Sequence, residues 1–223
     1  MVIRMGIITK YSAINLLPEL NIDSSKWNQI PAEQNISETI KAIETRGVIV
    51  LRVQDGVHAL STLKEIIPPG AEVMSGSSTT LIEIGFQQLI ESGEHEWNDL
   101  HKVVISENNV QKRNEIRRKS VIADYFLSGV NAIAASGELV SCDASGSRVG
   151  AWPFAAKNLV LVSGVNKIVP TLQRIREYAY PLEDVRSRKV NGVPSQIGKC
   201  VILAGERQKG RITLILINEG LGY

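Results

Sequence analysis

The chain has 223 residues, of which 43% are hydrophobic and 22% are charged, and its formal net charge is +2. This composition is typical of a soluble globular protein with a sizeable core, and the mild charge argues against nucleic acid or a membrane surface as a partner. The two cysteines form no CxxC pair, which argues against a disulfide scaffold or a zinc ribbon. No apolar run reaches membrane-spanning length, and the start lacks the features of a secretory signal. We therefore expect a soluble, cytoplasmic protein.

The first half of the chain alternates between helical and extended patterns. Residues 1–30 are predicted to be an N-terminal helical extension, with a helix from Tyr11 to Leu20, and residues 31–223 one α/β domain. Ile36, Ile40 and Ile43 form one apolar stripe, which is typical of a helix. The expected elements are a helix over 32–45, a strand over 48–53, a helix over 57–67, a strand over 71–74, and helices over 79–92 and 98–106. This order is typical of an open, mostly parallel sheet with flanking helices.

The second half is less regular. The predicted elements are a basic helix over 110–127, two short β runs around Ser136-Gly137, a polar loop over 142–150, a strand over 159–162 and a helix over 168–178 that ends at Pro181. Residues 181–198 are interpreted as a linker or a wrapping arm. The runs 200–205 and 211–218 flank a turn with glycine, which predicts a C-terminal β-hairpin.

A run of small hydroxylated residues follows the strand predicted over 71–74. A strand, a tight loop and a helix start in this order place unpaired backbone N–H groups and the positive end of a helix dipole beside the loop. Such a loop attracts a phosphate or a carboxylate, although Ser77 or Ser78 could also be only a helix cap. The candidate binding residues here are Ser75, Gly76, Ser77, Ser78, Thr79 and Thr80.

Ser136-Gly137-Glu138 places a polar step inside a buried run. Ser136 and Glu138 are two residues apart, so they share one face of an extended segment, and Gly137 permits a close backbone approach. Glu138 is a candidate catalytic base or carboxylate nucleophile. The alternative is an exposed turn in which Glu138 is merely solvated.

Four further residues are candidates for the same site, each with a structural alternative. Arg148 ends a Gly/Ser loop and can bind an anion bidentately, or it pairs with Asp143. Asn166 and Lys167 follow a buried strand at the rim of the sheet, where they contact a ligand, or where Asn166 caps a helix and Lys167 is solvated. Glu83 either faces the cleft as a catalytic carboxylate or completes a capping arrangement with Thr80.

Four segments in order, SGSSTTLIEIG, IAASGELV, DASGSRVGAW and VSGVNKIVP, resemble those of lactate-utilisation (LUD) domain proteins. That family is similar to ribose-5-phosphate isomerase, glucosamine-6-phosphate deaminase and coenzyme A transferases. The resemblance spans residues 32–220 and implies a ligand cleft at the carboxyl ends of the strands, and a role in oxidation of lactate to pyruvate beside iron–sulfur partner proteins. Longer members carry a cysteine-rich segment where this chain keeps only Cys200, so we expect no metal or iron–sulfur cofactor in this chain.

The leading hypothesis is a lactate-utilisation-type protein that binds an organic acid or a phosphorylated or nucleotide ligand and acts within a complex. The alternative is a stand-alone sugar-phosphate isomerase or acyl-coenzyme A transferase that uses Glu138 or Glu83. A third hypothesis is an interaction module whose basic helix, residues 110–119, docks an acidic partner and whose cleft is vestigial. The alternative for this basic face is a solvated helix surface without a partner. The sequence leaves the ligand, a homodimer and the role of residues 181–198 open.

Overall fold

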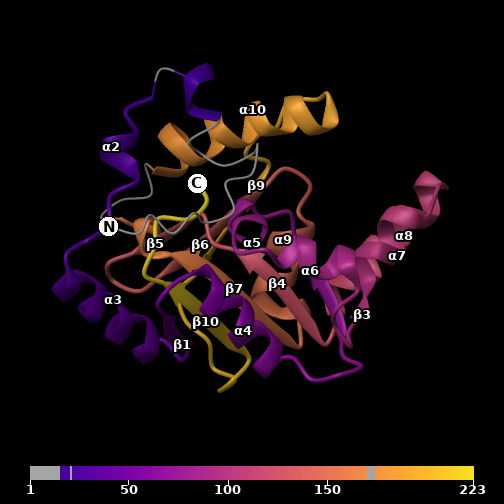
Figure 1. Cartoon of the computed structure of the whole chain (residues 1–223), viewed down its shortest axis with the longest axis horizontal. Coiled ribbons are helices and arrows are strands. Elements are labelled where there is room, and N and C mark those ends of the chain that lie inside the picture. Colours follow the sequence, from indigo (N-terminus) through magenta and orange to yellow (C-terminus); the bar gives the residue numbers. More distant parts are fainter. Residues whose placement is uncertain (1–15, 21, 170–173) are drawn as a thin grey trace.

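Six strands form a central sheet, sheet A, in which all neighbouring strands are parallel (Figure 1). The computed structural model describes residues 16–20, 22–169 and 174–223. In spatial order the strands are β1 (Ile49–Val53), β10 (Ile212–Ile217), β7 (Asn158–Gly164), β4 (Tyr125–Gly129), β2 (Glu72–Ser75) and β3 (Asn98–Asp99). The predicted α/β class with a mostly parallel sheet is confirmed.

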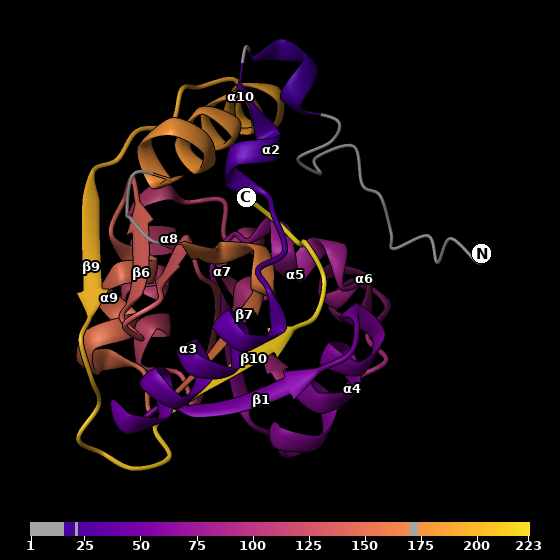
Figure 2. The same cartoon turned by 90° about the vertical axis from the view of Figure 1, so that its left-hand side faces the viewer.

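A smaller mixed sheet, sheet B, lies beside sheet A (Figure 2). Its strands, in spatial order, are β8 (Ile168–Val169), β5 (Ala132–Ala134), β6 (Leu139–Asp143) and β9 (Lys199–Leu203). The β5–β8 pair is parallel, and the β5–β6 and β6–β9 pairs are antiparallel. β5 and β6 are the two short runs that the sequence predicts around Ser136-Gly137.

Alternating side chains of sheet A point into two separate apolar cores, as the two-residue period of a strand requires. One face, with Leu159, Leu161 and Leu214, packs against α3 (Glu33–Thr45), α7 (Leu100–Ser106), the π-helical turn η3 (Ala151–Ala155) and sheet B. The other face, with Val160 and Ile215, packs against α4 (Gly56–Ile66), α5 (Thr79–Glu83) and α6 (Phe86–Ser92). The α-helices thus cover both faces of a buried parallel sheet.

A third apolar cluster forms above the carboxyl ends of the sheet A strands. It joins Leu16 and Trp27 of the N-terminal segment to Tyr178, Leu182 and Tyr223. The elements here are η1 (Leu17–Glu19), α2 (Ser24–Trp27), the π-helical turn η5 (Ile175–Ala179) and α10 (Tyr180–Asn191). The helix predicted from Tyr11 to Leu20 lies mostly outside the described residues.

Several predicted boundaries are wrong. The basic helix ends at Lys119 as α8 (Val110–Lys119), and after the 3-10 turn η2 (Ser120–Ile122) the chain enters β4, a central strand. The helix predicted over 79–92 divides into α5 and α6 at Gly85, whose φ is +87°. The predicted polar loop 142–150 contains the end of β6 and the short helix α9 (Ser147–Gly150).

The region around Pro181 is also different from the prediction. Pro181 lies in the first turn of α10, where a proline is tolerated because a helix begins with unbonded N–H groups. Residues 181–191, interpreted as linker, are therefore helical. Their buried residues, among them Leu182 and Val185, fix α10 over the carboxyl edge of sheet A.

The predicted C-terminal β-hairpin is wrong, although both of its strands exist. β9 pairs with β6 at the edge of sheet B, whereas β10 lies inside sheet A between β1 and β7. Arg211, immediately before β10, is buried and donates to Glu206 Oε2 at 2.5 Å and to the carbonyl oxygens of Trp152 (2.8 Å) and Ala156 (3.1 Å). This network directs the chain away from β9 and into the larger sheet.

Candidate functional site

The hydroxylated loop connects the carboxyl end of β2 to α5. Gly76 N donates to Leu127 O at 3.0 Å, which extends the pairing of β2 with β4. Ser78 is the N-cap of α5, because its Oγ accepts from Leu81 N at 3.3 Å. Thr79 and Thr80 are buried, whereas Ser77 is exposed. The helix-cap interpretation therefore accounts for Ser78, whereas Ser77 takes no part in the cap and remains exposed.

Lys167 is buried at the same edge, just beyond the end of β7. Its Nζ donates to Thr80 Oγ1 at 2.9 Å and to the carbonyl oxygen of Val130 at 2.8 Å. Lys167 is only 2% exposed. Burial, together with the positive charges of Arg174 and Arg148, lowers the pKa of Lys167 to about 7, against the opposing effect of Glu83. Lys167 is thus not a solvated side chain, and it ties β4, α5 and β7 together.

Glu83 lies beside Lys167 and under the C-terminal residues. Its Oε2 accepts from Gly222 N at 2.6 Å, and burial raises the pKa of this carboxyl. Gly222 has φ +63°, and a Cβ there would lie 2.3 Å from Thr80 Oγ1, so only glycine fits. Glu83 therefore holds the C-terminal segment across the ends of the strands, where the C-terminus is marked in Figure 1.

Two arginines from different elements reach the residue Ser77. Arg186 of α10 donates from Nη2 to Ser77 Oγ at 2.9 Å and binds both carboxylate oxygens of Glu183. Arg148 of α9 donates to Ser77 O at 3.4 Å and to Asn131 Oδ1 at 3.4 Å, and it also bonds the carbonyl oxygen of Cys142. The exposed Ser77 therefore lies between two guanidinium groups.

A third arginine, Arg174, is fully buried next to them. It donates to Trp27 O at 3.0 Å and to Asn131 O at 2.9 Å, and its guanidinium lies 5.0 Å from the ring centre of Tyr178. Burial lowers its pKa to about 10, so it is still charged at neutral pH. Arg174 Nη2 and the Tyr178 hydroxyl have no hydrogen-bond partner among the described residues. Buried donors of this kind are usually satisfied in folded proteins.

Four cations thus converge at the carboxyl edge, and we call them the basic cluster: Arg148, Lys167, Arg174 and Arg186. In the described part of the chain their acidic neighbours are Glu83, Asp143 and Glu183. Asp143 accepts from the backbone N–H of Arg148 at 3.0 Å, and Glu183 also accepts from Tyr223 Oη at 2.8 Å. Four basic and three acidic side chains therefore lie together in a largely buried place, and the pKa of about 7 leaves Lys167 only partly charged at neutral pH.

The structure does not place all predicted site residues together. Ser136, Gly137 and Glu138 form the β5–β6 turn, which packs against the end of α3: Arg46 donates to Ser136 O at 2.9 Å and pairs with Glu138. A Cβ on Gly137 would lie 2.6 Å from the Ala42 backbone. Arg46 lies just before β1, so this turn is at the amino edge of sheet A, away from the basic cluster.

The remaining predicted residues have mixed roles. Asn166 accepts from Leu221 N at 3.2 Å and bonds Asn28, so it anchors the segments that cover the edge. Asp143 accepts from the backbone N–H groups of Arg148 and Val149, both at 3.0 Å, rather than from the Arg148 guanidinium. Glu83 bonds Gly222 instead of forming the capping arrangement with Thr80 considered above.

Sequence reasoning missed Arg174 and Arg186. Both lie in a stretch whose apolar residues, Ile175, Ala179 and Leu182, are spaced by three or four positions and are buried. Arg186 continues that spacing, so a charged residue stands where the helical period demands an apolar one. A charged residue in an apolar stripe indicates a functional position. The interpretation of residues 181–198 as a linker excluded Arg186 from consideration.

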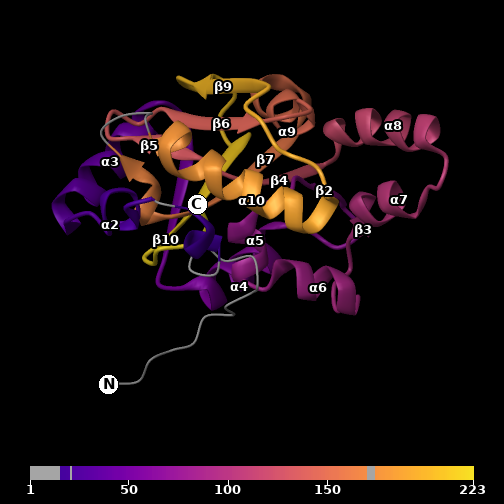
Figure 3. The ribbon, with the colours of Figure 1, turned by 90° about the horizontal axis from the view of Figure 1, so that it is seen from above.

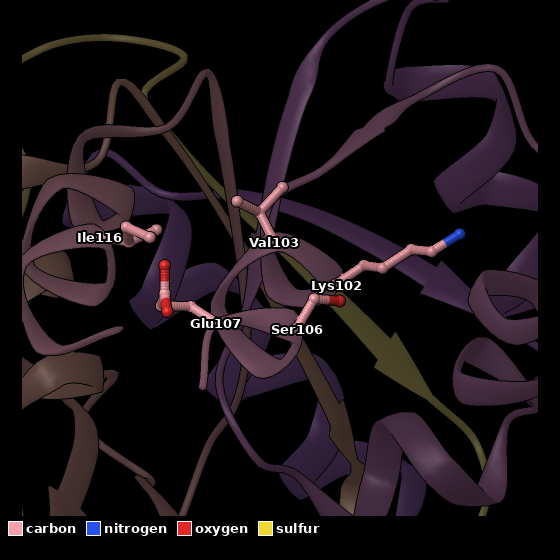
Figure 4. Close-up of a pocket in the computed structure, with 5 residues that line it drawn as sticks. All are labelled: Lys102, Val103, Ser106, Glu107 and Ile116. Carbon is pink, nitrogen blue, oxygen red and sulfur yellow. The ribbon is translucent and has the colours of Figure 1, made fainter. Parts of the chain in front are cut away.

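A groove away from this edge lies between α7 and α8, and it has a volume of about 460 Å³. Figure 4 shows that Ile116 faces it from α8, with Glu107 nearby and Lys102 directed away. Among the described residues there is no cluster of three or more potential metal ligands. No described helix is long and apolar enough to cross a membrane.

Comparison with known proteins places the chain in a family. A DUF162 family protein from Deinococcus radiodurans, solved as a crystal structure, matches with a TM-score of 0.45 and 12% sequence identity, covering 84% of this chain and 98% of that chain. No curated protein matches. The family model of the LUD domain matches residues 36–219, which is most of the chain. This chain therefore belongs to the LUD domain family.

Proposed function

We propose that the chain binds a small organic acid or a phosphorylated or nucleotide ligand at the carboxyl edge of sheet A, and that it supports lactate-to-pyruvate metabolism. The LUD domain, which is implicated in lactate utilisation, supports the metabolic role. The observation that carries the binding role is the basic cluster beside the exposed Ser77. Arginine pairs recognise carboxylates and phosphates with charge-assisted hydrogen bonds.

The hydrogen bonds within the basic cluster support a ligand site between Arg148 and Arg186. The Arg148 bonds to Ser77 O and Asn131 Oδ1 are long, both 3.4 Å, and both can be exchanged for a stronger ionic partner. The bond from Arg148 to the Cys142 carbonyl oxygen would hold the guanidinium in place. The positive end of the dipole of the short helix α5 adds a further contribution that favours an anion. An acid bound between Arg148 and Arg186 would form charge-assisted hydrogen bonds with both guanidinium groups.

Thermal unfolding against a panel of ligands tests this proposal: lactate, pyruvate, ribose and glucosamine phosphates, ATP, and coenzyme A thioesters. A ligand at a hundred times its Kd stabilises the fold by about 2.7 kcal/mol, which should raise the Tm by roughly 5 to 10 °C for a chain of this size. We expect Arg148→Gln to abolish the shift. Arg118→Gln, on an exposed part of α8, is the matched control and should retain it.

A ligand that shifts the wild type and Arg148→Gln equally would place binding elsewhere and contradict the proposal. A panel without any shift, repeated at millimolar ligand, would contradict it as well. Folding of both variants is checked by their Tm values without ligand.

We further propose that the chain works within a complex and that the α7–α8 pair is a contact surface. Figure 3 shows these helices at one end of the molecule. Val103, Ile105 and Val110 are exposed by 50%, 61% and 59%, and α8 carries exposed basic residues, among them Arg118 and Lys119. Exposed apolar side chains on α7, next to the exposed basic residues of α8, favour an acidic amphipathic partner.

Arg118→Glu combined with Lys119→Glu should reduce capture of that partner at least about tenfold, because reversed charges on α8 repel an acidic surface. The measurement is quantitative pull-down from extract of the source cells, with identification of iron–sulfur proteins. Lys64→Glu combined with Lys209→Glu, on other exposed surfaces, is the control of equal charge change. Unchanged capture in the α8 variant would exclude this surface.

The alternative is a stand-alone isomerase or acyl-transfer enzyme that uses a carboxylate. Glu83 is the observation in its favour, because its partly buried carboxyl lies within the candidate site and burial raises the pKa of that carboxyl. Glu138 is paired with Arg46 at the opposite edge of the sheet. Turnover of a bound ligand that is lost in Glu83→Gln and retained in Glu138→Gln would favour this alternative.

A further inference from the structure

Cys142 and Cys200 lie directly opposite each other on the antiparallel strands β6 and β9. Both are free thiols, and their sulfur atoms are 3.0 Å apart. Figure 2 shows β9 at the outer edge of sheet B beside β6. Neither thiol takes part in the basic cluster, and the proposed function assigns no role to either.

The directions of the Cys142 backbone N–H and C=O show whether Cys142 and Cys200 form a hydrogen-bonded or a non-hydrogen-bonded pair of the antiparallel ladder. Cys142 N donates to Asn131 Oδ1 at 3.0 Å, and its carbonyl accepts from Arg148, so both backbone groups point away from β9. Cys142 and Cys200 are therefore a non-hydrogen-bonded pair, in which Cα atoms are about 4.5 Å apart and side chains approach closely. That separation is within the range of about 4.4–6.8 Å that disulfides span.

We propose that Cys142 and Cys200 form a reversible intramolecular disulfide, which makes them a redox modification site that joins β9 to β6. The two thiols have unequal access to an oxidant. Cys142 is buried with Val140, Val169 and Tyr180, whereas Cys200 is exposed on the edge strand.

The burial of Cys142 determines which of the two thiols reacts first. Burial above all, and then the hydrogen bond and charge of Cys200, raise the pKa of the Cys142 thiol well above its ordinary range, so Cys142 stays protonated at neutral pH. The thiolate is the nucleophile in exchange. The exposed Cys200 is therefore the residue that meets the oxidant first.

A small disulfide such as oxidised glutathione supplies the oxidising equivalents. The Cys200 thiolate attacks one of its sulfurs, forms a mixed disulfide and releases one glutathione thiolate. Cys142 then loses its proton, attacks the Cys200 sulfur and releases the second glutathione. The chain loses two electrons and two protons, and one oxidised glutathione becomes two reduced molecules.

The bond would close a loop of 58 residues, which contains β7 and α10. Closing a loop of that length restricts the unfolded chain. We expect the oxidised protein to unfold at a temperature at least about 5 °C higher than the reduced protein. The edge strand β9 would become fixed, so its amide protons should exchange more slowly.

The test equilibrates the purified full chain with graded ratios of reduced and oxidised glutathione, blocks free thiols and measures intact mass and disulfide-linked peptides. The expected result is a monomer that has lost two hydrogens, with a peptide linking residues 142 and 200 and a raised Tm that dithiothreitol reverses. Cys142→Ser should stop at the glutathione adduct on Cys200. Cys200→Ser should stay unmodified because Cys142 is buried.

Three outcomes would overturn the proposal. The wild type could accumulate only the Cys200 adduct, could form only dimers linked between chains, or could remain reduced at every ratio. Each would show that the buried thiol does not reach its partner. The reduced Tm of each serine variant, compared with the reduced wild type, shows whether the variant is folded.

Discussion

Replacing Lys167 with methionine is expected to remove a pH dependence of stability that the wild type shows above neutral pH. The pKa of Lys167 is about 7 in the folded protein and near 10.4 in an unfolded chain. Between these values the unfolded chain binds more protons, so the free energy of unfolding rises with pH. The Lys167 contribution should grow by about 2 kcal/mol from pH 7 to pH 9.

The physical cause of this pH dependence is the burial of the Lys167 ammonium group beside Arg174 and Arg148. Below pH 7 the folded protein must hold this charge in the interior, and above it the neutral amine can still donate to Thr80 and Val130. Urea unfolding of wild type and Lys167→Met at several pH values measures the effect as a difference, which cancels other titrating groups. Lys64→Met, at an exposed position, is the control. Its free energy of unfolding should change with pH in the same way as that of the wild type. If the free energies of unfolding of Lys167→Met and the wild type had the same pH dependence, the prediction for the buried Lys167 charge would be wrong.

Arg211→Met is expected to cost about 3–5 kcal/mol of stability, because it leaves a buried carboxylate without its partner. The side chains of Arg211 and Glu206 are only 5% and 12% exposed. Arg211 also satisfies the carbonyl oxygens of Trp152 and Ala156. The loss of these contacts would destabilise the start of β10. Because β10 is a central strand, the stability of the whole of sheet A should decrease.

Urea unfolding at pH 7 measures this loss. Arg207→Met is the control, since Arg207 is exposed and surface substitutions usually change stability by less than about 0.5 kcal/mol. Adding Glu206→Gln to Arg211→Met should recover part of the loss, because the unpaired charge is then gone. A loss below about 1 kcal/mol for Arg211→Met would mean that the ion pair does not hold the strand entry.

The fold was largely predictable because sheet A is built from continuous apolar runs. Residues 48–53 and 159–162 are such runs, and each is flanked by a helical pattern, as parallel α/β sheets require. The sequence predicts helix as far as residue 127, although β4 begins at Tyr125, because an apolar run directly after a helix fits either period. Strand partners were not predictable: the 200–205 and 211–218 runs are close in sequence, yet buried contacts of Arg211 and β10 place them in different sheets.

The candidate site was predictable where local chemistry determines it. Ser75–Thr80 and Lys167 follow strands, so topology alone brings them to one edge. Glu138 was misplaced because a turn residue carries no sequence indication of which end of a sheet it reaches. Arg174 and Arg186 depend on α10 folding over that edge, which is a long-range packing event. A single sequence does not specify such contacts directly.

The position of β10 also affects how the protein is made. β10 lies between β1 and β7, yet a ribosome synthesises it after every other described strand. Until then β1 has no partner in sheet A, and β7 presents one unpaired apolar edge. Nascent domains with open strand edges are prone to association. We therefore expect that this domain completes its folding only after residue 217 has left the ribosomal tunnel, and that chaperones hold the unfinished chain until then.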